Sequence, residues 1–335
     1  MTERVCVVLK ADHVIGTGHL MRIKGLLQPL LKAGLEPCLL TDSLEPSLLP
    51  LCSEYREIAH FPMDSVEGFV KSARRLAPSL VLFDHYFLGD KFESPLRDFA
   101  KVAVVDDLER HHDCDLLTDS GFFKSGAEYR GKVPEGCSLL CGEQYSLIRP
   151  EFKGAALRRQ PHARLRLLVN YGGADPAHAC LKALTSIIEG RLFERYDVTV
   201  LSGISNPDHE RLVELSKDIP GAEVIRSTSQ VAGLFSRCDM ALGAYGGMFK
   251  ERMCAGLPAL NTVIADNQRG GGALVARLKC GYDISLEDLA RPQVLEGKLS
   301  LLESHLEECR EAGMREIGGE GIDLVSRALL KLAGI

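Results

Sequence analysis

The 335-residue sequence lacks the features of several protein classes. It has no run rich in Lys and Arg, and its formal net charge is −6, which argues against a nucleic-acid-binding surface. No apolar stretch is long enough to span a bilayer. Residues 1–4 lead directly into an apolar run and do not resemble a signal peptide. We therefore expect a cytoplasmic protein with neither a nucleic-acid nor a membrane partner.

The sequence also lacks a recognisable metal-binding pattern. Its 11 cysteines are scattered, and none forms a C-x-x-C pair. The closest two, Cys137 and Cys141, are four residues apart and have no second pair at zinc spacing. An odd number of cysteines without a secretion signal favours reduced, mostly structural thiols. We predict no metal site and no cofactor.

The first half alternates short apolar runs with amphipathic stretches. The expected strands are 5–9, 36–41, 80–84 and 102–105, and the expected helices are 20–27, 65–77 and 92–99. Strands separated by helices predict a parallel sheet that is covered on both faces. Ligands of such sheets bind beyond the carboxyl ends of the strands.

The alternation restarts after a polar stretch, 153–162, which we expect to be a linker. The second set of expected strands is 164–170, 197–202, 223–226, 239–243 and 257–261, with helices at 177–188, from 209, at 230–237 and over most of the remainder. The length also favours two domains. We predict an N-terminal domain over 1–155 and a C-terminal domain over 163–315, both of the doubly wound α/β class and facing a central cleft.

One turn stands out in the first half. Gly16-Thr17-Gly18-His19 lies between the first strand and the first helix. Glycines there permit close approach of a ligand to the backbone, and a helix N-terminus disfavours the charged form of a histidine. A tight turn with a capping histidine explains the same residues, and the short pattern alone does not decide between the two.

Other polar residues also follow expected strands. Asp84-His85-Tyr86 and Asp106-Asp107 fall at the same sheet edge as the first turn. Because adjacent strand residues point to opposite faces, a shared site for both carboxylates of Asp106-Asp107 is disfavoured, and we predict a structural or supporting role. The pair His111-His112 is interpreted as part of a polar loop.

The second half repeats the order of strand, glycine turn and helix. Asp175 and Pro176 are expected to cap the helix that follows Gly172-Gly173. Gly246-Gly247 at a helix start would offer backbone N–H groups to a diphosphate, and Glu251 one turn later would accept from ribose hydroxyls. Asn267-Gln268 could pair with sugar hydroxyl or amide groups. The alternative interpretation is that the glycines only permit close packing and that Glu251 is a solvated helix residue.

These motifs, in this order, resemble a known family. The set comprises Gly16-x-Gly18-His19-x-x-Arg22, Asp84-x-Tyr86, Val105-Asp106-Asp107, Tyr145-x-x-x-Arg149-x-Glu151-Phe152, Gly172-Gly173-x-Asp175-Pro176, Gly243-Ala244-x-Gly246 through Glu251 to Gly256-x-Pro258, and Asn267-Gln268. It resembles the nucleotide-sugar hydrolases of pseudaminic-acid biosynthesis, which remove UDP from a 2,4-diacetamido-trideoxy-altrose. That family is similar to the two-domain GT-B glycosyltransferases.

The resemblance implies an activity and a set of site residues. His19 would be the general base that activates water at the anomeric carbon of a nucleotide sugar, without a metal. Gly18, Arg22, Asp84 and Tyr86 would lie on the sugar side. The nucleotide side would comprise Gly172, Gly173, Gly246, Gly247, Glu251, Asn267 and Gln268. A last helix, at about 318–335, would pack back on the N-terminal domain.

The chain departs from the family at one place. Gly247-Met248-Phe249-Lys250 stands where relatives carry hydroxyl residues and an aromatic, so the nucleotide and the sugar remain open. A glycosyltransferase of the same fold and a nucleotide-sugar-binding protein without catalysis are the alternatives to the hydrolase.

Overall fold

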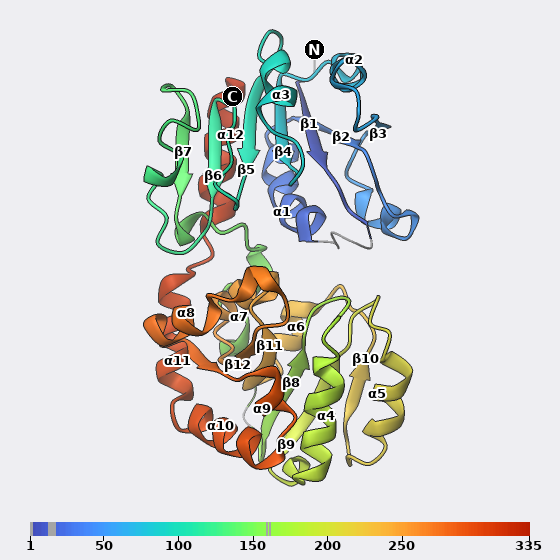
Figure 1. Cartoon of the computed structure of the whole chain (residues 1–335), viewed down its shortest axis with the longest axis vertical. Coiled ribbons are helices and arrows are strands. Elements are labelled where there is room, and N and C mark those ends of the chain that lie inside the picture. The colour runs from blue at the N-terminus through green and yellow to red at the C-terminus, as the bar shows by residue number, and fades with distance from the viewer. Residues whose placement is uncertain (1–2, 13–17, 159, 161) are drawn as a thin grey trace. The chain divides into compact units, whose positions relative to one another are not determined.

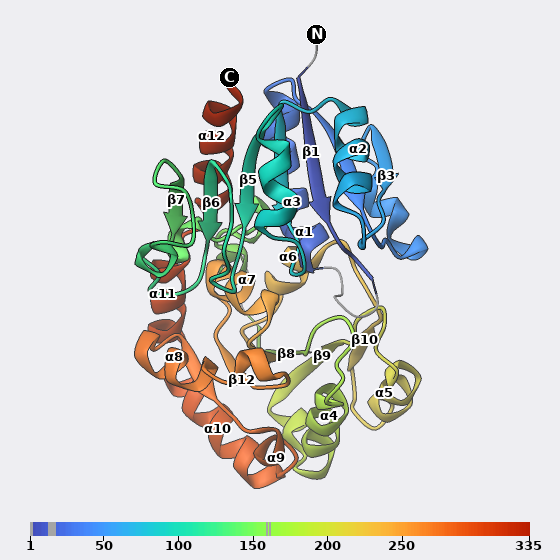
Figure 2. The same ribbon diagram turned by 45° about the horizontal axis from the view of Figure 1, so that its top comes forward.

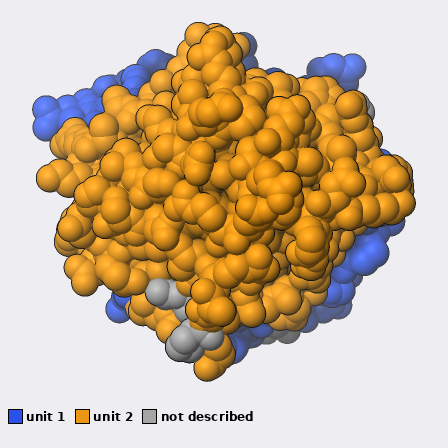
Figure 3. All heavy atoms as spheres, turned by 90° about the horizontal axis from the view of Figure 1, so that it is seen from below, with its two compact units in different colours: residues 1–150, 319–335 blue, residues 151–318 orange. Residues whose placement is uncertain are grey.

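The structure is a computed structural model that describes residues 3–12, 18–158, 160 and 162–335. Its internal contacts divide the chain into two compact units, Met1–Pro150 with Gly319–Ile335, and Glu151–Gly318 (Figure 3). The chain therefore returns to the first unit with its last residues.

The first unit is built on a seven-stranded parallel sheet (Figure 1). Its strands are β1 (Arg4–Leu9), β2 (Glu36–Thr41), β3 (Glu57–His60), β4 (Leu80–Asp84), β5 (Lys101–Val105), β6 (Leu116–Asp119) and β7 (Ser138–Cys141). They lie in the order β3-β2-β1-β4-β5-β6-β7. All pairings are parallel, as the alternation of strands and helices predicts.

Helices cover both faces of this sheet. They are α1 (Gly18–Lys32), α2 (Val66–Leu76), α3 (Asp90–Glu93) and α12 (Gly321–Ala333). Short 3-10 helices add η1 (Pro46–Cys52), η2 (Ser94–Leu96), η3 (Ala127–Tyr129) and η4 (Glu143–Tyr145), while η5 (Pro150–Phe152) begins at the boundary of the two units. Val5, Val7 and Leu9 of β1 pack with α1 and α12, while Cys6 and Val8 face α2. The alternation along β1 thus serves two apolar layers, and α12 contacts α1, β5 and β6 (Figure 2).

The second unit repeats the plan with six parallel strands, in the order β10-β9-β8-β11-β12-β13. These are β8 (Leu165–Asn170), β9 (Tyr196–Leu201), β10 (Glu223–Ile225), β11 (Met240–Ala244), β12 (Ala259–Thr262) and β13 (Gly281–Asp283). The helices are α4 (Ala179–Glu189), α5 (His209–Ser216), α6 (Val231–Phe235), α7 (Gly247–Ala255), α8 (Gly271–Leu278), α9 (Leu286–Leu289), α10 (Pro292–Ser304) and α11 (Leu306–Glu316). Short 3-10 helices are η6 (Ala155–Arg158), η7 (Leu192–Glu194) and η8 (Asp266–Gln268).

Both sheets reverse their strand order once, and the reversal defines where a ligand fits. In the first unit β1 and β4 are neighbours, although β2 and β3 follow β1 in sequence. In the second unit β8 and β11 have the same relation. The connections leave these neighbouring strands in opposite directions, which opens a crevice at their carboxyl ends. The predicted class of two doubly wound α/β domains is confirmed.

Several predicted elements are wrong in detail. The short strands β3, β6, β7 and β13 were not expected, although the equally short β10 and β12 were. The predicted helix at 92–99 ends at Glu93 and continues as a 3-10 turn, because Pro95 cannot donate to an α-helical ladder. The segment predicted as a linker, 153–162, includes buried Ala155 and Ala156, which belong to the second unit.

Candidate functional site

The first cluster lies at the strand reversal of the first unit. Leu9 of β1 pairs in register with Asp84, the last residue of β4. His19 and Arg22 lie one turn apart on α1, which starts after β1, so both face the end of β4. Gly16 and Thr17 of the predicted turn lie outside the described residues.

His19 is held by a buried carboxylate. Its Nδ1 makes a short contact with Asp84 Oδ1, and His19 is only 4% exposed while Asp84 is fully buried. An ionised carboxylate only accepts hydrogen bonds, so Nδ1 carries the proton and Nε2 is the basic nitrogen. No hydrogen bond of Nε2 is formed among the described residues. This arrangement orients an imidazole that can take up a proton.

Arg22 keeps Asp84 ionised. Its Nε donates to Asp84 Oδ2 at 2.6 Å, and a terminal nitrogen donates to Oδ1, which makes a bidentate pair. Burial by itself would raise the pKa of Asp84, but the Arg22 guanidinium and the contact with His19 hold it well below its usual range. The same Arg22 nitrogen lies 3.2 Å from His19 Nδ1, because both donors converge on one oxygen.

Tyr86 and Asp107 extend the cluster toward the surface. The Tyr86 ring packs edge-on against His19, with ring centroids 4.4 Å apart. Its hydroxyl donates to Asp107 Oδ2 at 3.4 Å, and Arg22 donates to the same oxygen at 3.2 Å. Burial and the charge of Asp107 raise the pKa of Tyr86 to about 12, so its hydroxyl keeps its proton at neutral pH. Gly18, at the start of α1, is exposed, and a Cβ there would meet nothing within 4 Å.

The structure adds detail to the residues predicted for this cluster. Both Asp84 oxygens are engaged inside the unit, where the carboxylate orients His19, and its place on the sugar side stays a prediction. Asp106 and Asp107 diverge as expected, since Asp106 is buried while Asp107 meets Arg22. His111 and His112 lie in a loop as predicted, and His112 is buried there with its Nδ1 2.7 Å from Glu93.

Sequence reasoning missed Arg110. Its guanidinium donates to the backbone carbonyls of His85, Tyr86 and Leu88, which form the turn after β4. Asp106 holds Arg110 in turn, through Arg110 Nε at 2.9 Å. The i, i+4 spacing of Asp106 and Arg110 was the available signal. Arg110 therefore sets the position of the turn that carries Tyr86.

The second cluster lies at the strand reversal of the second unit. Gly246 and Gly247 follow β11 and begin α7, and Gly246 has no side-chain capping bond. Gln268 of η8 lies beside them, since its Nε2 would be 3.6 Å from a Cβ at Gly246. Its Oε1 accepts from the backbone N–H of Ile264 at 3.0 Å, which holds the loop after β12. The side chain of Asn267 lies outside the described residues.

Gly172 and Gly173 have a different environment. Gly172 has φ +90°, a conformation that favours glycine, and Gly173 O accepts from Ser205 N at 3.0 Å. The α4 helix begins at Ala179, two residues later than expected, because His178 at its N-cap has positive φ. Asp175 has positive φ as well. Its carboxylate still accepts from the N–H groups of Ala179 and Cys180. The N-terminus of α4 is therefore closed by Asp175, whereas α7 starts after Gly246, which has no side chain of its own to cap it.

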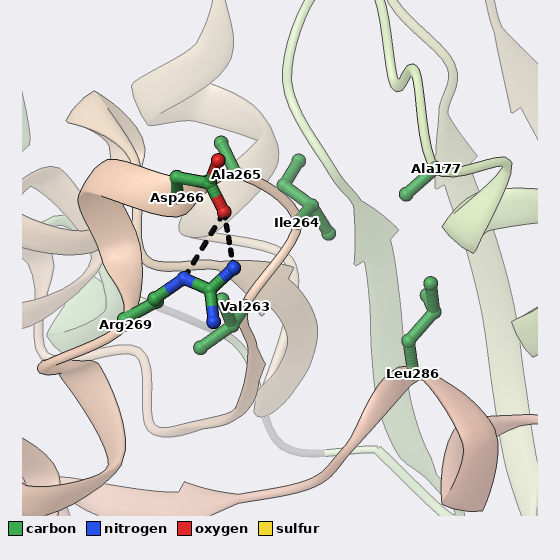
Figure 4. A pocket seen from close by; sticks show the side chains of 7 residues that line it. All are labelled: Ala177, Val263, Ile264, Ala265, Asp266, Arg269 and Leu286. Carbon is green, nitrogen blue, oxygen red and sulfur yellow. Dashed lines mark hydrogen bonds and ion pairs between the residues drawn. The ribbon is translucent and has the colours of Figure 1, made fainter.

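Glu251 is partly buried on α7 and lies one turn beyond Gly247. An open cavity of about 290 Å³ adjoins the loop after β12 (Figure 4). It is lined by Ala177, Val263, Ile264, Ala265, Asp266, Arg269 and Leu286. The Arg269 guanidinium pairs with Asp266 at its rim, at 2.5 Å.

The described residues hold neither a cluster of metal ligands nor a membrane-spanning helix. Within the described ranges, no three His, Cys, Asp or Glu side chains come together as metal ligands. The eleven cysteines are free, and all but Cys137 are buried. Among the helices that the structure describes, none has the length and apolar character to cross a membrane.

Two curated proteins are similar to the chain in sequence. The UDP-2,4-diacetamido-2,4,6-trideoxy-beta-L-altropyranose hydrolase of Campylobacter jejuni is 28% identical over 207 residues, which cover 61% of this chain and 73% of that protein. The spore coat polysaccharide biosynthesis protein SpsG of Bacillus subtilis is 22% identical over 328 residues, 95% of both chains. No protein-family model matches the chain. The resemblance drawn from the motifs is thus confirmed at the level of sequence similarity.

Solved structures share the fold at low identity. MurG of Acinetobacter baumannii superposes with a TM-score of 0.70 and 14% identity, covering 98% of this chain and 99% of that one. The UDP-GlcNAc 2-epimerase of Neisseria meningitidis, solved with UDP-GlcNAc, has a TM-score of 0.63 and 13% identity, with 98% and 100% covered. The expected GT-B-like architecture is confirmed.

Proposed function

We propose that this chain, similar in sequence to a nucleotide-sugar hydrolase and to SpsG, hydrolyses a nucleotide-activated amino or deoxy sugar. The reaction releases a nucleoside diphosphate and the free sugar, and it serves pseudaminic-type or related glycan biosynthesis in the cytoplasm. One observation carries the proposal: a buried, Arg22-paired Asp84 holds Nδ1 of His19, which makes Nε2 a base at the strand reversal. The name of the Campylobacter jejuni relative supports the reaction class.

The proposed step uses His19 as general base. Nε2 takes a proton from water while the water oxygen bonds to the anomeric carbon. The bond from that carbon to the diphosphate oxygen breaks, and its electron pair leaves with the diphosphate. Asp84 stabilises the imidazolium that forms, because its negative charge is retained by Arg22. A diphosphate is a good leaving group, so the proposal includes neither metal nor cofactor.

The remaining site residues are assigned by position. Gly18 and Tyr86 border His19 and would face the sugar, while Arg22 and Asp84 would set the orientation and charge of His19. On the nucleotide side, the N-terminus of α7 at Gly246 and Gly247 would receive the diphosphate.

Other residues would complete the nucleotide side. Glu251 would accept from the ribose, and Asn267 and Gln268 would border the same end. Gly172 and Gly173 would let the ligand approach the turn after β8, where a Cβ would meet nothing within 4 Å at either glycine.

The test is the release of nucleotide from a panel of UDP-, GDP- and CDP-linked amino sugars without any acceptor. We expect free nucleoside diphosphate from wild type, and ¹⁸O from labelled water in the sugar. His19→Gln keeps an N–H donor for Asp84 but no base, and it should lose the activity. His60→Gln, at an exposed strand residue, is the control.

Two outcomes would contradict the hydrolase. Release that requires an added sugar or lipid acceptor would identify a glycosyltransferase. Tight binding without turnover by wild type would identify a nucleotide-sugar-binding protein. Activity that survives His19→Gln would leave hydrolysis intact and remove His19 as its base.

A further inference from the structure

Arg252 is a buried cation next to the start of α7. Its side chain leaves the helix toward the N-terminus, as helical side chains do. One terminal nitrogen donates to Ala244 O at 2.7 Å and to Asn261 Oδ1 at 2.8 Å, and the residue is only 3% exposed. A Cβ at Gly243 would lie 2.5 Å from the other terminal nitrogen, so the glycine admits the guanidinium.

The charge of Arg252 is not matched by a hydrogen-bonded anion. Both acceptors are neutral, Nε is buried without a partner, and Arg252 forms no ion pair within the described part of the chain. Burial lowers its pKa to about 10, while Glu251 acts on it only through space, so Arg252 stays charged at neutral pH. The buried Asp84 is fully paired by comparison. An unmatched buried charge is costly.

The location adds to this cost. Arg252 reaches Ala244, two residues before Gly246, where the helix dipole of α7 places partial positive charge. The N-cap residue of this helix is Gly246, which has no side chain of its own to cap it, whereas Asp175 closes the start of α4. Two positive sources therefore converge on the N-terminus of α7. An anion bound there would relieve both.

We propose that the buried positive charge of Arg252 attracts a diphosphate to the N-terminus of α7 without contacting it. The inference rests on the proposed nucleotide-binding role of Gly246 and Gly247 and deepens it. Met248 and Phe249 have no hydroxyl groups that could bind phosphate. The buried charge of Arg252 would supply attraction in place of such hydroxyls.

The experiment measures binding of inorganic pyrophosphate, UDP and uridine by calorimetry. Arg252→Gln keeps a donor for Ala244 or Asn261 but removes the charge, and Arg252→Lys keeps the charge. Arg310→Gln is the matched control, since Arg310 is also buried in this unit but donates to Gly256 O at the opposite end of α7. Circular dichroism and thermal unfolding establish that each variant folds.

We expect Arg252→Gln to weaken UDP and pyrophosphate binding by about tenfold or more, because one unit charge acts on a diphosphate of about two charges. Uridine binding should change less than about twofold, since it carries no charge. Arg252→Lys should keep most of the UDP affinity, and Arg310→Gln all of it.

Equal loss of UDP and uridine, or no loss of either, overturns the charge role of Arg252 and leaves the hydrolase proposal standing. If Arg252→Gln does not fold, Arg252→Lys decides: a loss of UDP affinity in that folded variant overturns a role through charge alone. If pyrophosphate binding depends on Arg252 but the protein releases no sugar, the inference is supported and the proposed function is contradicted. Wild type that binds neither pyrophosphate nor UDP overturns the inference.

Discussion

Asp84→Asn tests whether the buried carboxylate sets the protonation of His19. Asparagine has nearly the same shape, but its amide carries one N–H₂ group and one oxygen. If the amide presents its N–H₂ to His19, the proton moves to Nε2 and the base is lost. If it presents the oxygen, the imidazolium formed in the reaction has no anion beside it. We therefore expect kcat to fall by about 10²–10⁴-fold, as for other oriented histidine bases.

The same change has a cost in stability. Breaking a buried charge pair typically costs about 3–5 kcal/mol, and we expect the lower end, about 3 kcal/mol, because Arg22 is partly exposed and keeps Asp107. The pKa of Asp84 lies below its ordinary value of 3.8, so its contribution is present above that pH and is lost as pH falls through the folded value. The difference in unfolding free energy between wild type and Asp84→Asn should thus be full at pH 7 and shrink in acid.

The control is a second His–Asp pair in the same unit. His85 Nε2 lies 3.0 Å from Asp42 Oδ1, and His85 is buried. Asp42→Asn should lower stability while kcat stays within about threefold of wild type, because this pair is not assigned to the reaction. The assays are nucleotide release and urea unfolding. A folded Asp84→Asn protein with wild-type kcat would refute the reasoning that Asp84 activates His19.

Three further predictions address other parts of the molecule. Gly247→Ala should raise the free energy of unfolding in urea by up to about 1 kcal/mol, because a Cβ there would meet nothing within 4 Å and Ala favours helix. UDP binding, measured by calorimetry, should weaken if a phosphate approaches this backbone. Burial lowers the His112 pKa, but the hydrogen bond to Glu93 and the Asp106 carboxylate, 3.5 Å from Nε2, outweigh it and raise the pKa to about 9. The stability that His112 contributes is therefore full below pH 6.5 and is lost as pH rises through about 9. His112→Gln should remove this slope, up to about 1.4 kcal/mol per pH unit. Arg110→Lys should raise KM for the nucleotide sugar by about tenfold with an unchanged pH profile of kcat, because the turn after β4 loses carbonyl contacts; an unchanged KM would contradict that role.

Much of the fold follows from local pattern. The apolar runs at 5–9, 36–41 and 80–84 coincide with β1, β2 and β4 to within a residue, because buried parallel strands are continuously apolar. Glycine turns after β8 and β11 were equally visible. The edge strands β3 and β13 were not, because so short a strand gives only a weak pattern, although the equally short β10 was predicted. The end of α3 at Glu93 depended on Pro95, and the start of α4 at Ala179 depended on the positive φ of His178.

The amino-acid sequence by itself determined the α/β class, the order of the motifs and the identity of His19 as the candidate base. Those features are local or depend only on the order of residues along the chain. Only the tertiary structure decided that Asp84 serves His19, that Arg110 holds the turn after β4, and that Arg252 is a buried charge with no paired anion among the described residues. Each of these depends on which strands become neighbours and on how far a side chain is removed from water, and neither property is carried by a stretch of sequence alone.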